Sequence, residues 1–275
     1  MSNTQKALTN GELYTRAPAI FATGPHSKRS ERFGYVPTIT VIEGLRANGF
    51  QPTWAGACKT RDKDKLGFEK HMVRFTADEA RSRSGSVPQL VLVNAHDGSS
   101  SYQLHAGMFT MVCLNGCIFS KGQAEVVKVR HNGDVVNNVI EGSYKVIKDA
   151  DAALEEAAEW RGITMNADDK FKFGKMALYN RFGVNEETGE PDTLITPDQI
   201  IMPRRIGGEP DSLWQAFQNA QEWAIRGGLR SVNPETRRVS HTREIQGIDA
   251  VVDVNTKLSE TATLFARTFG IKRAA

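Results

Sequence analysis

The sequence predicts an α+β protein in which an antiparallel β-meander with an early helix is followed by a helical C-terminal half. Up to residue 134, short runs rich in β-branched and aromatic residues are separated by turn-forming residues. Beyond residue 134, the apolar residues recur at helical spacing. The 275 residues, 40% hydrophobic and 24% charged, have the composition of a globular protein rather than a disordered or collagen-like one.

The β-rich half is expected to begin with an arm, a loop and one helix. Residues 1–20 show weak periodicity and are interpreted as a flexible N-terminal arm. Residues 24–35 are basic and aromatic, with several turn-forming residues, and are interpreted as an ordered loop. A helix over residues 38–48 begins directly after Pro37 and ends at Asn48-Gly49.

A series of strands is expected after this helix. The run 87–94 is the strongest because it is rich in β-branched residues, and the Asp97-Gly98 pair after it is typical of a turn. Residues 102–114 fit either a strand or a buried helix, and the Asn115-Gly116 pair favours a strand within a second hairpin. The expected strands cover residues 50–58, 68–75, 87–94, 102–114, 117–119 and 125–130.

The remaining residues are expected to form helices around a basic loop over residues 230–243. The first helix is rich in Ala and Glu and could break near Gly142, and the second starts with acidic residues and ends at Gly183. The expected helices cover residues 135–160, 168–182, 211–226 and 244–269. Because no linker rich in Pro or Ser is visible, residues 21–275 are expected to form a single domain.

Composition and sequence pattern also limit the cellular location and the cofactors that we expect for the protein. No apolar run approaches the ~18 residues of a membrane span, and the first twenty residues lack a signal-peptide pattern. The three cysteines, Cys58, Cys113 and Cys117, provide neither a disulfide framework nor the paired spacing of a metal site. We therefore expect a soluble, cytoplasmic protein that requires no metal or other cofactor.

The motifs of the common catalytic classes are missing from the sequence. It contains no Walker A sequence, no Gly-rich dinucleotide fingerprint and no nucleophile elbow. Three histidines and two aspartates could assemble a metal-dependent nuclease site, although they lack the spacing of a zincin or a zinc finger. These residues are His71, His96, Asp97, His131 and Asp134. We expect a protein that is not an enzyme, with the nuclease as an alternative.

The charge and the aromatic residues favour a nucleic-acid partner. The formal net charge is +3, but residues 1–148 carry 19 basic and 12 acidic side chains, whereas residues 149–192 carry 5 and 11. Proteins that bind single strands combine a basic groove with aromatic side chains, because cations neutralise phosphates and every base offers a face for stacking. The residues expected to bind nucleic acid are Lys28, Arg29, Arg32, Phe33, Tyr35, Trp54, Lys59, Arg61, Lys63, Lys65, Lys70, Arg74, Arg130, Arg204 and Arg205.

Several motifs together resemble a phage- and plasmid-borne family, domain of unknown function 932, which includes the YfjQ/YafZ-like proteins. The motifs are Phe33-Gly34-Tyr35-Val36-Pro37-Thr38, Gly49-Phe50, Gly67 to Phe75, Leu92 to Leu104, Val129 to Asp134, Met202 to Arg205, Leu213-Trp214 and Arg226-Gly227-Gly228. The resemblance spans the chain from about residue 20. It implies a mobile genetic element as the setting and implies no activity.

The order of the expected elements is also similar to the β-β-β-α core of single-strand annealing proteins of the Redβ, RecT and Erf types. That resemblance implies a homo-oligomer, a ring or a filament, that holds single-stranded DNA in a basic groove. The leading hypothesis is therefore a single-stranded DNA-binding or annealing protein of a phage or plasmid, acting in recombination or replication. The second is a counter-defence protein that binds a host immune or restriction complex through the acidic segment 149–192.

Overall fold

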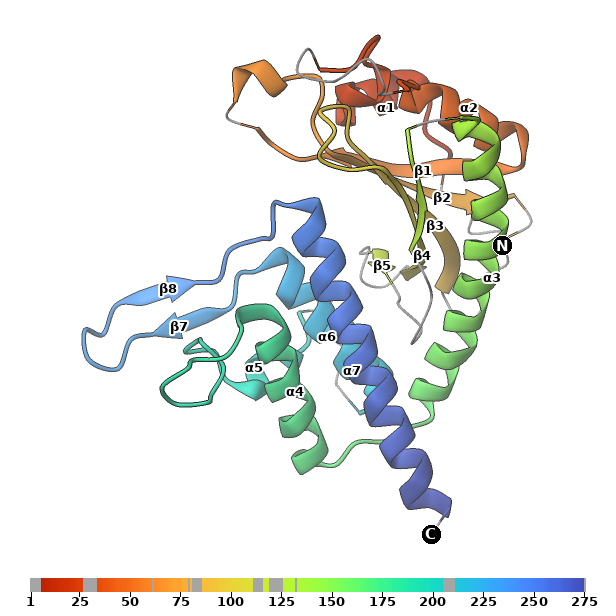
Figure 1. The fold of residues 1–275 in the computed structure, drawn as a ribbon. Helices are drawn as coiled ribbons and strands as arrows, with labels where there is room; N and C mark the ends of the chain where they lie inside the picture. The colour runs from red at the N-terminus through yellow and green to blue at the C-terminus, as the bar shows by residue number, and fades with distance from the viewer. Residues whose placement is uncertain are drawn as a thin grey trace. The chain divides into compact units, whose positions relative to one another are not determined.

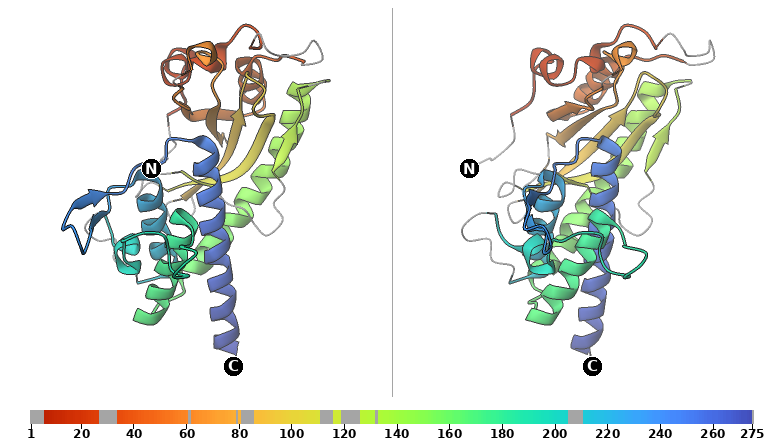
Figure 2. Two further views of the ribbon diagram at one scale, coloured as in Figure 1. Left: turned by 60° about the vertical axis from the view of Figure 1, so that its left-hand side comes forward. Right: turned by 90° about the vertical axis from the view of Figure 1, so that its left-hand side faces the viewer.

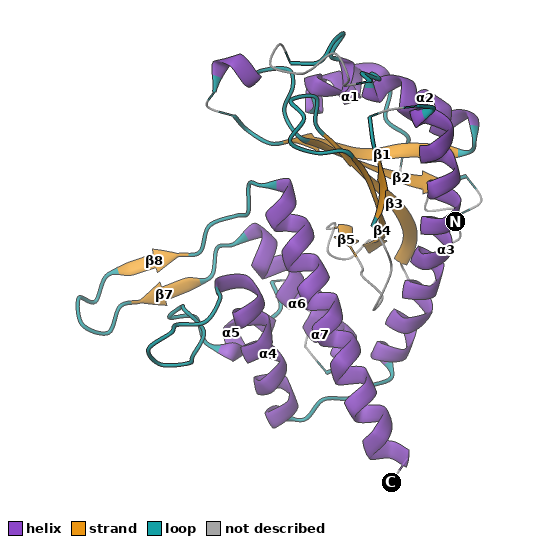
Figure 3. Cartoon of the chain, in the orientation of Figure 1, coloured by secondary structure: helices purple, strands orange, loops and turns teal. Residues whose placement is uncertain are grey.

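The fold was obtained as a computed structural model and comprises two compact units (Figure 1). The first contains Met1–Leu154 and Gln246–Ile248, and the second contains Glu155–Ile245 and Asp249–Ala275. The structure describes residues 6–26, 34–60, 62–78, 80, 86–110, 116–118, 126–131, 133–204 and 211–274. Strands predominate in the first unit and helices in the second (Figure 3), so the predicted α+β class is confirmed.

The first unit is built on an antiparallel sheet with the strand order β1-β2-β3-β4-β5, in which β6 also pairs with β4. β5 pairs with one end of β4, at Gly107 to Phe109, and β6 with the other end, at Tyr102 to Leu104. The strands are β1 (Phe50–Ala57), β2 (His71–Ala77), β3 (Ser86–Asn94), β4 (Tyr102–Thr110), β5 (Gly116–Ile118) and β6 (Val127–Val129). The predicted strands therefore form over their described residues, and residues 111–115, 119 and 125 of these predictions lie outside the described residues.

Helices before and after the strands in sequence pack apolar side chains against this sheet. Helix α2 (Thr38–Ala47) and the long helix α3 (Val135–Arg161), green in Figure 2, flank the sheet in sequence. Alternate residues of a strand point to opposite faces, so one face of each strand joins the same core. The core includes Val41, Ile42 and Leu45 from α2, Val135, Val139 and Val146 from α3, and Val73, Phe75, Leu90, Leu92 and Leu104 from the sheet.

Helix α3 runs unbroken through Gly142, where a break was expected. A Cβ atom at Gly142 would lie 2.8 Å from Val127 Cγ1 and 2.9 Å from Leu104 Cδ1. The glycine therefore allows the helix to approach the sheet, and the packing that this approach permits outweighs the low helix propensity of glycine.

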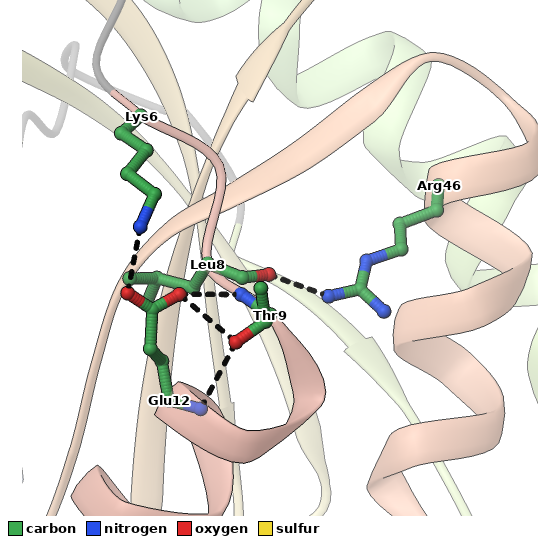
Figure 4. A network of polar contacts seen from close by, with 5 residues as sticks. All are labelled: Lys6, Leu8, Thr9, Glu12 and Arg46. Carbon is green, nitrogen blue, oxygen red and sulfur yellow. Dashed lines mark hydrogen bonds and ion pairs between the residues drawn. The ribbon is translucent and has the colours of Figure 1, made fainter.

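Part of the expected N-terminal arm forms helix α1 (Asn10–Arg16) and the 3₁₀ turn η1 (Pro18–Phe21). The helix is capped by reciprocal hydrogen bonds between Thr9 and Glu12, and Lys6 lies 3.0 Å from the Glu12 carboxylate (Figure 4). Arg46 of α2 donates to the Leu8 carbonyl oxygen at 2.7 Å and ties this segment to the unit. A seven-residue helix is too short to show helical periodicity, so the sequence pattern missed it.

The described residues of the second unit form four helices and one hairpin besides the end of α3. Its elements are α4 (Ala167–Phe182), α5 (Pro197–Ile201), α6 (Leu213–Arg226), β7 (Arg230–Val232), β8 (Val239–His241) and α7 (Ile248–Ala274), of which Ile248 belongs to the first unit. The rings of Trp160 and Phe217 are 5.3 Å apart in its core. Residues 230–243, expected to be a loop, instead contain the β7–β8 hairpin. The single domain expected over residues 21–275 stays a prediction.

Candidate functional site

The first unit contains a buried polar cluster centred on the hydroxyl of Thr38, the first residue of α2. Thr38 Oγ1 lies 2.9 Å from His71 Nε2 and 3.0 Å from His96 Nε2. The Asn94 side-chain amide donates to the same oxygen at 3.0 Å. His71 begins β2, Asn94 ends β3, and His96 lies in the turn that follows β3. One hydroxyl therefore joins α2 to the ends of two neighbouring strands.

The hydrogen bonds determine where the protons of this cluster lie. His71 Nδ1 is 2.9 Å from the Glu69 carbonyl oxygen, so this nitrogen carries the proton and His71 Nε2 accepts from Thr38. A hydroxyl has one proton, so Thr38 Oγ1 must accept from His96 Nε2–H as well as from Asn94. His96 Nδ1 is then unprotonated, in agreement with its having no hydrogen-bond partner among the described residues.

Burial keeps both histidines neutral. Desolvation lowers the pKa of His71 to about 4, although the bond to Glu69 partly opposes it. Desolvation also lowers the pKa of His96 to about 3, with a further contribution from repulsion by His71 and His131. At neutral pH the cluster is therefore an uncharged network.

Two tyrosines connect the network to the segment that precedes α2. The Tyr102 hydroxyl donates to the Val36 carbonyl oxygen at 2.9 Å, and its oxygen is 3.4 Å from Thr38 Oγ1. The Tyr35 hydroxyl donates to the Ala22 carbonyl oxygen, and its ring centroid lies 5.1 Å from that of His96. Burial raises the pKa of Tyr35 to about 12. Tyr35, one of the residues predicted to bind nucleic acid, therefore links the segment before α2 to Ala22 and to the His96 ring.

The cluster has the connectivity of a nucleophile, a base and an orienting group, in the order Thr38, His71 and the Glu69 carbonyl. Thr38 has no exposed surface, however, and His71 is 1% exposed, so the hydroxyl does not face solvent. Among the residues that the structure describes, no three His, Cys, Asp or Glu side chains form a group that could hold a metal ion. Among these described residues, the structure therefore shows no metal centre that the nuclease hypothesis could use.

The polar cluster anchors the basic connection, which we define as residues 58–70 between β1 and β2. The His96 amide donates to the Phe68 carbonyl oxygen at 3.3 Å, and Lys65 forms an ion pair with Asp97 at 3.3 Å. The Cys58 amide donates to the Lys70 carbonyl oxygen at 2.8 Å and closes the connection. These bonds hold a polar surface segment against the buried network.

Several predicted nucleic-acid residues lie in the basic connection or on the two strands that it joins. Lys59, Lys63 and Lys65 are exposed, with Lys63 and Lys65 in the short 3₁₀ turn η2 (Lys63–Lys65). Trp54 is 40% exposed on β1, opposite Arg74 in the β1–β2 register. The Arg74 guanidinium carbon lies 5.6 Å from the centroid of the Trp54 ring.

Gly56 leaves room for the Trp54 ring. A Cβ atom at Gly56 would lie 2.6 Å from Trp54 Cη2, so only glycine lets the ring lie along the strand at this position. The result is an exposed aromatic ring beside the Arg74 side chain, which is itself only 7% exposed, on the strand that leads into the basic connection.

The other predicted residues are more dispersed. Arg130 is exposed just after β6, and Lys70 is half-buried. Arg204 belongs to the second unit, where its guanidinium carbon lies 4.1 Å from the centroid of the Trp223 ring. Lys28, Arg29, Arg32, Phe33, Arg61 and Arg205 lie outside the described residues.

The sequence interpretation missed Thr38 and Asn94 as site residues. The residues next to them in sequence do not mark either one as a site residue, because Thr after Pro and Asn at the end of a strand are common in turns and helix caps. Both lie within the motif segments quoted above. Described parts of four of these motif segments, residues 34–38, 67–75, 92–104 and 129–131, meet at or beside the polar cluster.

The fold and the cluster define an α+β protein whose distinctive motifs meet at one buried network. Residues 25–257 match the family model "Domain of unknown function (DUF932)", and the chain belongs to this family. It is 38% identical over 253 residues to "UPF0380 protein YafZ" and to "UPF0380 protein YfjQ" of Escherichia coli (strain K12), covering 92% of this chain and 89% of each relative. No solved structure matches. No helix in the described part of the chain is long and apolar enough to cross a membrane.

Proposed function

We propose that the protein binds single-stranded DNA and anneals complementary strands during recombination or replication of a phage or plasmid. The observation that carries the proposal is the exposed Trp54 ring on β1, the strand that leads into the basic connection with its exposed Lys59, Lys63 and Lys65. An aromatic face next to cations is what a single strand requires, because its bases are open to stacking and its phosphates to neutralisation.

The anchoring of the basic connection supports this function. A mobile loop would lose conformational entropy each time it bound a strand, which reduces affinity. The bonds from His96 and Asp97 restrain this loop before the ligand arrives. In this proposal the polar cluster acts as a scaffold for the binding surface.

The order of the elements supports the analogy with annealing proteins. Helix α2 ends at Ala47 and is followed, after Gly49 with φ 78°, by strands β1 to β4 and later by the long helix α3. In such proteins base pairing itself drives annealing, so the proposed activity needs no catalytic residue, nucleotide or metal. Assembly into a homo-oligomer is part of the proposal.

A binding experiment with matched variants tests the site. We expect fluorescence anisotropy with a labelled single-stranded oligonucleotide to show salt-sensitive binding. Trp54→Ala should weaken it by about 1 to 3 kcal/mol, or about 5- to 150-fold, while Trp54→Phe keeps a stacking face and loses less. Lys59→Gln with Lys63→Gln should lower the slope of log K against log salt by about 1.4.

Annealing and assembly need separate measurements. The rate at which two labelled complementary strands form a duplex should rise with wild-type protein and fall with Trp54→Ala. The mass in solution should exceed that of one 30.4 kDa chain. Binding that survives both sets of substitutions would refute the site, and no binding at low salt would refute the function.

The counter-defence alternative receives less support. Within the acidic segment 149–192, Asp168 pairs with Lys172 and Glu190 pairs with Lys175 at 2.7 Å, so part of its negative charge is compensated. A stoichiometric host protein recovered from lysate after nuclease treatment would favour this alternative.

A further inference from the structure

The second unit carries an exposed basic ribbon, which we call the β7–β8 arm and define as residues 229–243. The hairpin pairs Arg230 with His241, Ser231 with Ser240 and Val232 with Val239. All six residues are exposed or half-buried, and Val232 and Val239 are 37% and 46% exposed. The arm extends from the helices of its unit in Figure 1 and in the left view of Figure 2.

The arm is firmly attached at its base. The Gly228 amide donates to the Thr242 carbonyl oxygen at 2.8 Å, and the Thr242 amide donates to the Leu229 carbonyl oxygen at 2.9 Å. Gln199 and Arg181 donate side-chain hydrogen bonds to the carbonyl oxygens of Arg230 and Arg243, both at 3.0 Å. These bonds set the direction in which the arm leaves the unit.

Gly227 makes this attachment possible. It has φ 64°, and a Cβ atom there would lie 2.5 Å from the Arg243 carbonyl carbon. Only glycine fits a left-handed conformation with backbone this close. The Arg226-Gly227-Gly228 motif of the sequence therefore forms the base of the arm.

The tip of the arm is ordered by its own hydrogen bonds. The Asn233 side chain accepts from the amides of Glu235 and Thr236 at 2.9 and 2.8 Å. The Arg237 amide donates to the Asn233 carbonyl oxygen at 3.0 Å, and Arg237 has φ 58°, a left-handed conformation that glycine adopts more easily. An arginine therefore occupies a position where local backbone preference favours glycine.

The charge of the arm is strongly positive. Residues 229–243 contain four arginines and one acidic residue, Glu235. Among the described residues, none of these arginine side chains forms an ion pair, and all four are exposed. The arginines are Arg230, Arg237, Arg238 and Arg243. Such a surface attracts polyanions.

We propose that the β7–β8 arm binds double-stranded DNA by placing its ribbon in the major groove. A two-stranded β-ribbon fits this groove, where arginines reach phosphates and base edges and the hydroxyl and amide groups of Ser and Asn add hydrogen bonds. Single-stranded DNA fits the arm less well, because residues 229–243 contain no Phe, Tyr or Trp on which bases could stack. Duplex DNA is thus a second ligand, distinct from the single strand proposed for the basic connection.

Substitutions at the tip test the proposal in the full-length protein. The probes are a labelled 25-base-pair duplex and one of its single strands, each titrated across a salt series. Arg237→Gln with Arg238→Gln should weaken duplex binding about 10-fold or more at 0.1 M salt and lower the salt slope by about 2. Glu235→Gln removes the one acidic residue and should strengthen duplex binding.

A further variant separates charge from folding. Arg237→Gly removes the cation but relieves the left-handed backbone, so hydrogen exchange of the β7 and β8 amides should stay as slow as in the wild type. Its duplex affinity should still fall, and its single-strand affinity should not change. Trp54→Ala should give the opposite pattern, which distinguishes the two proposed sites.

The proposal is overturned if the wild-type protein does not bind the duplex, or if the arginine substitutions leave duplex affinity and salt slope unchanged. It is also overturned if single-strand affinity falls as much as duplex affinity, because the arm would then belong to the single-strand site. Loss of single-strand binding in Trp54→Ala alone would leave the arm proposal intact.

Discussion

The hydroxyl of Thr38 is the most sensitive atom of the polar cluster, and Thr38→Val tests its role. Valine keeps the shape of threonine and removes the oxygen that His71, His96 and Asn94 share. Three buried polar groups would then lose a partner, at about 1 to 3 kcal/mol each. We expect the free energy of unfolding to fall by at least about 3 kcal/mol. Thr38→Ser keeps the hydroxyl, loses one methyl group and should cost about 1 kcal/mol.

Urea unfolding, followed by far-UV circular dichroism, measures both variants. With an m value of about 3 kcal/mol per M, Thr38→Val should lower the midpoint by about 1 M and Thr38→Ser by about a third of that. Hydrogen exchange should localise the loss to the amides of β2 and β3. The reasoning is refuted if valine costs no more than serine, because the hydroxyl would then contribute nothing beyond its volume.

Two further predictions follow from burial and packing. The pKa values of His71 and His96, about 4 and about 3, lie below the unfolded value of about 6.5, so the unfolded state binds protons that the folded state does not. The free energy of unfolding should therefore fall as the pH drops below 6.5, and at pH 5 the loss should be about 2 kcal/mol for each histidine. Equal urea midpoints at pH 7 and pH 5 would contradict this prediction. Gly142→Ala should destabilise by about 1 to 2 kcal/mol because its Cβ meets Val127 and Leu104, whereas Gly24→Ala, which meets no atom within 4 Å, should be neutral in thermal unfolding.

Much of the fold could be predicted because its signals are local. The β-branched run before Asn94 predicts β3, and the glycines at 49, 183 and 227 lie within two residues of the ends of three helices. The errors have physical causes. Helix α1 is too short for periodicity to be seen, and the hairpin after Gly228 has strands of three residues, too few to distinguish from a loop.

The candidate site could be predicted only in part. Lys59, Lys63 and Trp54 were found because a basic run and a nearby aromatic residue are visible in the sequence. Arg74 and Trp54 become neighbours through the β1–β2 register, which is a long-range property. The polar residues Thr38 and Asn94 are 56 positions apart, and no periodicity links them.

The sequence by itself determined the fold class, most element boundaries and the charge of the surface segments, because these follow from side-chain period, turn chemistry and composition. Tertiary structure alone decided that α3 continues through Gly142 and that one hydroxyl joins His71, Asn94 and His96. Both outcomes depend on how closely a helix and the ends of strands approach each other. That distance is set by packing and sheet register across the chain, which local preferences do not encode.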